Sequence, residues 1–198
     1  MKNLKEKRST QDMPTSNALQ KEMKRERYKR RFSKLLRSTV NALIVVAAVA
    51  ALIATLILPV LQIAGTSMQP TLNENDIVLM VKTGNLETGD LCAFYYSNKI
   101  LIKRVIAGPG DYIWIEPDGT VYLNGNALDE PYVSEKALGE CDVEFPYQVP
   151  ENSYFVMGDH RETSIDSRSS VIGCIAEDQI IGKIFCKFWP ISDFKFIN

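Results

Sequence analysis

The chain has 198 residues and a formal net charge of −1, which hides an uneven distribution of charge. Residues 1–37 carry thirteen Lys/Arg and four Asp/Glu, or +9, whereas the remainder carries ten Lys/Arg and twenty Asp/Glu, or −10. This pattern predicts a basic arm joined to one acidic domain of medium size. A basic arm can bind nucleic acid, but the apolar segment that follows this one indicates a membrane instead, and we expect no nucleic-acid partner.

A long uncharged segment follows the arm. Val40–Leu58 is a run of nineteen residues that is polar only at Asn41 and Thr55, and Pro59 ends it. An α-helix of this length crosses the roughly 30 Å of hydrocarbon in a bilayer. The run is longer than the apolar region of about 7–15 residues in a cleaved signal peptide. We therefore expect an uncleaved transmembrane anchor over residues 38–61, and a buried helix of a soluble protein is the less favoured alternative.

The excess of Lys/Arg before the anchor predicts its orientation. Residues 1–37 then form a cytoplasmic arm, in which Leu19–Leu36 is expected to be helical, with basic residues near anionic lipid. Residues 62–198 form an extracytoplasmic domain. The protein is expected to be a single-pass protein of the plasma membrane.

Short apolar runs separated by Gly, Pro, Asn and Asp follow the anchor and predict β-strands. These runs are Asp76–Lys82, Leu91–Tyr96, Ile100–Ala107, Tyr112–Glu116, Thr120–Leu123, Ser153–Met157 and Gln179–Phe188. Residues 126–150 lack this pattern and are expected to be irregular. The predicted fold class is mainly β, with a curved or partly closed β-sheet domain after one N-terminal transmembrane helix.

The cysteines do not indicate a metal site. Cys92, Cys141, Cys174 and Cys186 all fall in the exported part. No pair has close C-x-x-C spacing and the chain has one histidine, so we expect no metal and no other cofactor. The compartment permits one or two disulfides, and four reduced cysteines fit equally well.

The first candidate functional segment is Gly65-Thr-Ser-Met-Gln-Pro-Thr-Leu72, between the anchor and the first expected strand. Gly65 and Pro70 bracket Ser67, so the backbone is expected to turn tightly and to hold the hydroxyl outward. Such a serine is either a turn residue that bonds its own backbone or a nucleophile. It becomes a nucleophile only beside a base that removes its proton.

The second segment is the expected strand Ile100–Ala107, which carries Lys103 and Arg104 among apolar residues. Because strand side chains alternate, the two cations point to opposite faces, and both are buried if both faces are covered. Arg104 cannot lose its proton and then needs a carboxylate partner. Burial lowers the pKa of a lysine, so Lys103 can become a base near neutral pH. An isolated strand lysine would more often extend its amine to solvent.

The third segment is Met157–Arg168, which holds three acids, two arginines and three hydroxyl residues. By itself it is typical of a charged surface loop. Read with the other two segments, it can supply a carboxylate for Arg104 and a hydroxyl that orients Lys103.

Together the three segments resemble bacterial type I signal peptidase. The resemblance rests on Gly-Thr-Ser-Met-Gln-Pro-Thr-Leu, on Lys103-Arg104 in a β run and on Gly-Asp-x-Arg-x-x-Ser-x-Asp-Ser-Arg, in this order after an anchor. It covers residues 40–190 loosely and the three motifs closely, and the single anchor is similar to the Gram-positive form. The resemblance implies a membrane-anchored serine endopeptidase that removes signal peptides from exported preproteins, and we expect a monomer.

The resemblance also implies roles for individual residues. Ser67 would be the nucleophile, Lys103 the general base, and Ser164 the residue that orients the lysine. The backbone N–H of Ser67 would donate to the oxyanion. Three residues would be structural partners of the site: Asp159, Asp166 and Arg168. Four residues would line shallow pockets for small substrate side chains: Ile63, Met68, Leu72 and Ile102.

Within this set, either Asp159 or Asp166 is expected to pair with Arg104. Two positions depart from the family pattern. Some relatives have a serine two residues before the nucleophile as a second oxyanion donor, but this chain has Gly65, so Thr66 or a backbone amide is left to donate. His160 stands where the family usually has asparagine.

Three alternatives remain. His160 lies beside Asp159 and could complete a Ser-His-Asp triad, as in eukaryotic-like relatives. The chain could instead be an anchored β scaffold that binds secreted proteins, although the intact pair of Ser67 and Lys103 speaks against it. Self-cleaving Ser-Lys repressors share the dyad and a β fold, but the transmembrane anchor disfavours them.

Overall fold

A single long helix precedes the β-strands. The computed structural model describes residues 16–57, 59–83 and 85–197, and in it α1 runs without a break over Ser16–Ile57. Its 42 residues correspond to about 63 Å at ~1.5 Å per residue. The helix contains neither glycine nor proline, and Pro59 follows it. The expected arm helix and most of the expected anchor are therefore one element, while residues 60 and 61 at the end of the anchor range 38–61 lie in a strand.

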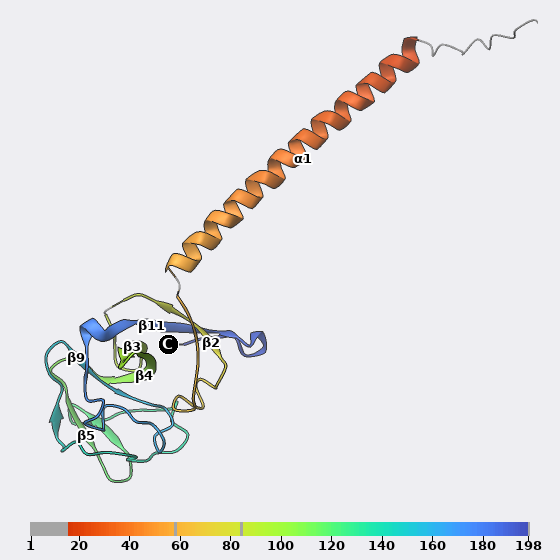
Figure 1. The fold of residues 1–198 in the computed structure, drawn as a ribbon. Coiled ribbons are helices and arrows are strands. Elements are labelled where there is room, and N and C mark those ends of the chain that lie inside the picture. Colours follow the sequence, from red (N-terminus) through yellow and green to blue (C-terminus); the bar gives the residue numbers. More distant parts are fainter. Residues whose placement is uncertain (1–15, 58, 84, 198) are drawn as a thin grey trace, which may run out of the picture. The chain divides into compact units, whose positions relative to one another are not determined.

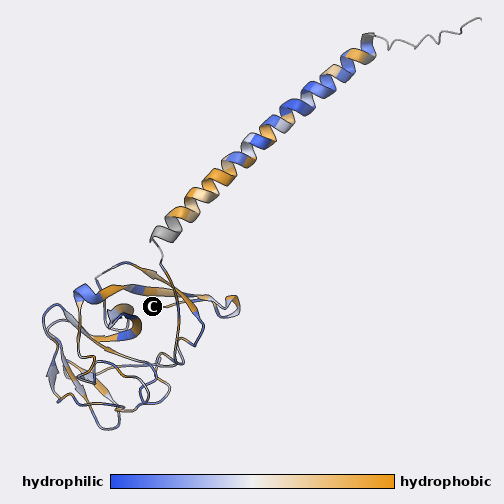
Figure 2. Ribbon diagram, in the orientation of Figure 1, coloured by the Kyte–Doolittle hydropathy of each residue, from blue (hydrophilic) through white to orange (hydrophobic). Residues whose placement is uncertain are grey.

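The two ends of α1 differ in polarity. Its N-terminal half is hydrophilic and the half that follows is apolar (Figure 2). A segment within Leu19–Leu52 is long and apolar enough to cross a membrane. The chain divides into two compact units within the last turns of this helix, between Leu52 and Ile53.

The strands fall into two antiparallel sheets. Their bounds are β1 Val60–Gln62, β2 Ile77–Val81, β3 Leu91–Tyr96, β4 Lys99–Ala107, β5 Tyr112–Ile115, β6 Val121–Leu123, β7 Asn126–Ala127, β8 Tyr147–Gln148, β9 Ser153–Met157, β10 Ile175–Ala176, β11 Ile180–Trp189 and β12 Lys195–Phe196. The larger sheet has the order β1-β2-β11-β3-β4-β9-β10, with β12 also paired to β11. The smaller sheet has the order β7-β6-β5-β8. The mainly β prediction is confirmed.

The strand order brings distant segments together. The late strand β11 lies between β2 and β3, so the end of the chain packs beside its first strands (Figure 1). Two short 3₁₀ turns flank β11, over Glu177–Gln179 and Ile191–Asp193. This arrangement places β4 between β3 and β9, where both of its faces are covered over residues 103–107.

The sequence predictions match the longer strands and miss the short ones. The bounds of β3 and β9 are those expected. Those of β4, β5 and β6 differ by one residue at one end, and those of β2 and β11 differ by one residue at each end. The prediction that residues 126–150 are irregular is wrong for β7 and β8. Each of these has two residues, too few for an alternating pattern to be visible. All four cysteines are free thiols in this structure.

Gly182 shows how closely two backbones approach in the larger sheet. A Cβ at this position would lie 2.2 Å from the carbonyl oxygen of Val81 and 3.1 Å from the Cα of Lys82. Both neighbouring atoms belong to the backbone, so they cannot move aside as a flexible side chain would. Glycine is therefore required where β11 passes β2.

We expect Gly182→Ala to destabilise the β domain by about 1–3 kcal/mol, because the added methyl group overpacks the sheet. The measurement is chemical denaturation of the full chain in detergent, followed by tryptophan fluorescence. Gly108→Ala is the matched control, because its Cβ would meet nothing closer than the Asp111 carboxylate at 3.6 Å. Equal stability of the two variants would contradict the close approach.

Candidate active site

Ser67 lies in a loop of residues 63–76 that joins β1 to β2, here called the Ser67 loop. Backbone hydrogen bonds hold its two ends together. The N–H of Ile63 donates to the carbonyl of Asp76 at 2.8 Å, and the N–H of Asn75 donates to the carbonyl of Ile63 at 2.9 Å. The loop is therefore a closed excursion from a β-hairpin, with its base extending the pairing of β1 and β2.

The turn around Ser67 has the form that the sequence predicted. Gly65 has a φ of +93°, a region that favours glycine. The N–H of Gln69 donates to the carbonyl of Thr66 at 3.0 Å, which closes a turn over Ser67. The side chain of Met68, the next residue, is buried in the core, so the serine occupies a well-anchored segment.

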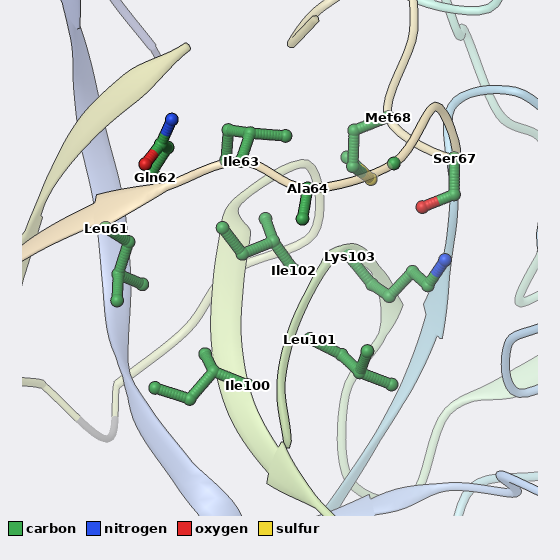
Figure 3. A pocket seen from close by; sticks show the side chains of 11 residues that line it. Leu61, Gln62, Ile63, Ala64, Ser67, Met68, Ile100, Leu101, Ile102 and Lys103 are labelled. Carbon is green, nitrogen blue, oxygen red and sulfur yellow. The ribbon is translucent and has the colours of Figure 1, made fainter. Parts of the chain in front are cut away.

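Lys103 on β4 is buried, with 4% of its surface exposed. Its amino group donates to the hydroxyl of Ser164 at 2.8 Å. Burial lowers the pKa of Lys103 from 10.5 to about 8, against the opposing effect of the Asp166 carboxylate. Figure 3 shows the Ser67 hydroxyl and the Lys103 amine turned toward each other at one end of a pocket. An amine that is partly neutral near pH 8 thus faces the serine.

Gly158 lies between Ser164 and the backbone of the Ser67 loop. A Cβ at this glycine would lie 2.2 Å from the Ser164 hydroxyl oxygen and 2.6 Å from the carbonyl oxygen of Ser67. The N–H of His160 donates to the same carbonyl of Ser67 at 3.1 Å. The glycine after β9 therefore lets the backbone of the third segment pack directly against the Ser67 loop.

Arg104, beside Lys103 on β4, is buried and points to the opposite side of the strand, where it pairs with Asp159. Its Nε donates to Asp159 Oδ1 at 2.8 Å and its Nη2 donates to Oδ2 at 2.6 Å. Its Nη1 donates to the carbonyl of Gly89 at 2.7 Å. The hydroxyl of Thr71 donates to Asp159 Oδ2 at 2.5 Å. One ion pair thus joins β4, the third segment and the Ser67 loop.

The other expected partner, Asp166, binds Arg168 instead. Arg168 donates to both carboxylate oxygens of Asp166, at 2.8 Å and 2.9 Å, and to the carbonyl of Leu138 at 2.6 Å. Asp166 also accepts the N–H of Gly158 at 2.9 Å. These bonds fold the third segment back on itself and present Ser164 to Lys103.

Three residues near this site were given no role from the sequence, although one of them, Arg161, belongs to the third motif. Arg161 forms a fully buried ion pair with Glu130. Tyr132 donates to Glu130 at 3.1 Å, and its ring centre lies 3.8 Å from the guanidinium carbon of Arg104. Both Glu130 and Tyr132 belong to the stretch predicted to be irregular. The need of a buried Arg161 for a carboxylate was a usable signal, but nothing in the sequence identifies which carboxylate.

The pocket beside Ser67 and Lys103 has a volume of about 110 Å³. Residues 61–65, Ser67, Met68 and residues 100–103 line it. In the described part of the chain, β4 pairs with β9 only from Arg104 onward, so residues 100–103 have one edge without a strand partner. An extended peptide can pair with such an edge.

Three of the four predicted pocket residues lie at this pocket: Ile63, Met68 and Ile102. Leu72 does not. It is fully buried and packs with Val78 and Ile184 in the core beneath the Ser67 loop. An apolar residue in a loop that packs on a sheet can face the sheet as readily as the cavity, so the role of Leu72 in a substrate pocket stays a prediction.

The single histidine lies beside the site, and among the residues that the structure describes no carboxylate pairs with its ring. The Nδ1 atom of His160 bonds the hydroxyl of Thr163 at 2.8 Å. The neighbouring Asp159 carboxylate is occupied by Arg104 and Thr71. A Ser-His-Asp triad built on Asp159 would need both interactions to be broken.

Comparisons with known proteins identify the family of this chain. The family described as "Signal peptidase, peptidase S26" matches residues 36–189. Signal peptidase IB of Staphylococcus aureus (strain MRSA252) is 39% identical over 154 residues, covering 68% of this chain and 79% of the relative. Signal peptidase I of Bacillus licheniformis is 36% identical over 146 residues, covering 67% and 77%.

A crystal structure of a signal peptidase I from Enterococcus faecalis overlaps 50% of this chain and 96% of that chain, at 28% identity and a TM-score of 0.41. The family match extends from the apolar half of α1 to the end of β11 and includes all three segments of the site. The chain therefore belongs to the signal peptidase family, peptidase S26, and is a serine peptidase, as its resemblance to bacterial type I signal peptidase predicted.

Proposed function

We propose that this chain is a membrane-anchored endopeptidase that cleaves signal peptides from exported preproteins with a dyad of Ser67 and Lys103. The family supports the cleavage of signal peptides. The observation that carries the dyad is the burial of Lys103 beside a hydroxyl, which lowers its pKa to about 8 and turns its amine toward Ser67 (Figure 3).

The reaction has two halves, and in each half one proton moves to the amine of Lys103 and then leaves it again. The neutral amine of Lys103 accepts the proton of Ser67 Oγ while the oxygen attacks the carbonyl carbon of the scissile bond. The oxyanion that forms accepts a hydrogen bond from the backbone N–H of Ser67. The C–N bond then breaks as the Lys103 ammonium returns the proton to the leaving amine. A water molecule, deprotonated by the same lysine, then attacks the acyl carbon; the ester C–O bond breaks as Lys103 returns this proton to Ser67 Oγ, which frees the serine and the neutral amine.

Neighbouring residues support this proton transfer. Ser164 fixes the direction of the Lys103 amine, and the Asp166–Arg168 pair holds Ser164 in place. Gly65 offers no hydroxyl, so a second oxyanion donor would come from Thr66 or from another backbone amide. The occupied ring nitrogen of His160 favours lysine over histidine as the base.

The pocket favours small substrate side chains. An extended peptide that pairs with the free edge of residues 100–103 turns alternate side chains toward the pocket. A volume of about 110 Å³ divided between two such side chains suits residues as small as alanine. The proposed substrate therefore has Ala-x-Ala before the cut.

Residues 38–61 are proposed to enter the membrane, with residues 1–37 in the cytoplasm and residues 62–198 outside as a monomeric domain. The apolar half of α1 supports the anchor (Figure 2), and the basic half supports the orientation. Several apolar residues at the C-terminal end, which could have been core, are about half exposed or more, and this favours contact with lipid headgroups: Phe188, Trp189, Ile191, Phe194 and Phe196.

The dyad is tested by three substitutions assayed on a purified preprotein. We expect Ser67→Ala and Lys103→Ala each to lower kcat by at least about 10⁴-fold, because each removes one half of a single proton-transfer step. His160→Ala is the control and is expected to remain within about tenfold of the wild type. Loss of activity in His160→Ala with an active Lys103→Ala would identify the triad instead.

The pH dependence tests the identity of the base. Burial lowers the pKa of Lys103 to about 8, so the amine is protonated and inactive below that pH and neutral above it. We expect kcat/KM to rise about tenfold per pH unit below pH 8 and to level off above it. A rate that stays constant between about pH 6 and 9 is incompatible with Lys103 as the base.

Substrate choice tests the pocket. Replacing either alanine of Ala-x-Ala by leucine is expected to lower kcat/KM by at least roughly tenfold, because the larger side chain does not fit. The same replacement at the middle position is the control, since that side chain points away from the pocket. The products are sequenced by mass spectrometry. Efficient cleavage after two bulky residues would disprove the pocket assignment while leaving the dyad intact.

A further inference from the structure

A second buried lysine lies in the β domain. Lys187 on β11 has 1% of its side chain exposed. Its amino group lies 3.1 Å from Asp76 Oδ2 and also bonds Asp193. Burial alone would lower the pKa of Lys187, but the hydrogen bonds to Asp193 and Asp76 outweigh it and raise the pKa. The two carboxylates therefore favour the charged form of Lys187, whereas the amine of Lys103 meets a hydroxyl.

The first partner of Lys187 is a residue at the base of the Ser67 loop. The backbone carbonyl of Asp76 accepts the N–H of Ile63 at 2.8 Å, which begins the loop. The side chain of Asp76 accepts the N–H of Asn73 at 2.8 Å, which closes the last turn of the loop. Oδ2, the oxygen that accepts the N–H of Asn73, is also the oxygen that lies 3.1 Å from the Lys187 amine. The ammonium therefore contacts the residue that makes both hydrogen bonds at the ends of the loop.

The second partner is near the end of the chain. Asp193 ends the 3₁₀ turn that follows β11, and about half of its side chain is exposed. Beyond it, the N–H of Ile197 donates to the carbonyl of Phe185 at 2.8 Å, and Ile197 packs with Ile63 in the core cluster beneath the Ser67 loop. By pairing with both Asp193 and Asp76, Lys187 links the C-terminal segment to the base of the Ser67 loop.

We propose that Lys187 is a positioning residue for peptide cleavage: its ammonium binds the carboxylate of Asp76 and thereby holds the base of the Ser67 loop, with Ser67 and the pocket residue Ile63 in place. This role rests on the proposed function of Ser67. Asp76 is 5% exposed, so without Lys187 its carboxylate would be a buried charge with no counter-ion. The loop base would have to open for water to reach it, while the exposed Asp193 could be hydrated where it is.

The test compares hydrogen exchange and kinetics in variants of the full chain in detergent. Lys187→Met is expected to speed exchange of the Ile63, Asn73 and Asn75 amides by about tenfold or more, with the smaller β5–β6 sheet unchanged. It should lower kcat by roughly 10- to 100-fold, because a displacement of about 1 Å at the reacting group has this effect. The pH midpoint near 8 should stay, because Lys103 and its hydroxyl partner lie on other elements.

Two further variants test the charge itself. Adding Asp76→Asn to Lys187→Met removes the unpaired carboxylate and should restore at least part of the lost protection and kcat. Lys183→Met is the matched control, because Lys183 is on the same strand but pairs with Asp90, outside the Ser67 loop. It should leave the loop amides and kcat near wild-type values.

Several outcomes overturn the role of Lys187. These are loop exchange and kcat in Lys187→Met equal to those in Lys183→Met, a uniform rise of exchange over the whole domain, or no recovery in the double variant. If Lys187→Met does not fold, Lys187→Gln is compared with wild type, and unchanged loop exchange overturns the role. A wild-type protein without peptidase activity would instead count against the proposed dyad. Hydrogen exchange of the loop amides does not depend on activity and would still test the role of Lys187.

Discussion

The ion pair of Arg104 and Asp159 is the interaction on which the site depends. It is bidentate and almost fully buried, and Asp159 also accepts the hydroxyl of Thr71 from the Ser67 loop. The three segments that carry the chemistry are far apart in the sequence, and each contributes one group to this cluster. Removing either charge would leave the other buried without a partner, so the three segments are held together by the same electrostatic requirement.

The buried charges around this pair are partitioned so that one amine can be neutral. Arginines take the carboxylates of Asp159, Asp166 and Glu130, each in a buried ion pair. A lysine beside a free carboxylate would be held in its charged form, as Lys187 is. Lys103 has a hydroxyl as its hydrogen-bond partner, and burial therefore lowers its pKa. Each of these three carboxylates is paired with an arginine, and Lys103 keeps the hydroxyl of Ser164 as its hydrogen-bond partner.

The fold supplies an open edge beside a rigid core. β4 is paired on both sides from Arg104 onward but on one side over residues 100–103, so a single strand carries both the buried lysine and the edge available to a peptide. The Ser67 loop covers the neighbouring core with Met68 and Leu72. The proposed cleavage site therefore lies where regular pairing stops, and the residues proposed to select the substrate continue the same strands that lead to the proposed dyad.

The sequence by itself determined the local features of this protein. Alternation along a strand was enough to place Lys103 and Arg104 on opposite faces, and turn residues were enough to bound β3 and β9 correctly. Only the tertiary structure decided that Arg104 pairs with Asp159 while Asp166 takes Arg168, that Leu72 faces the core, and that Glu130 belongs to the site. The physical reason is range: strand periodicity and turn geometry act over a few residues, whereas the partner of a buried charge depends on which distant strands pack together.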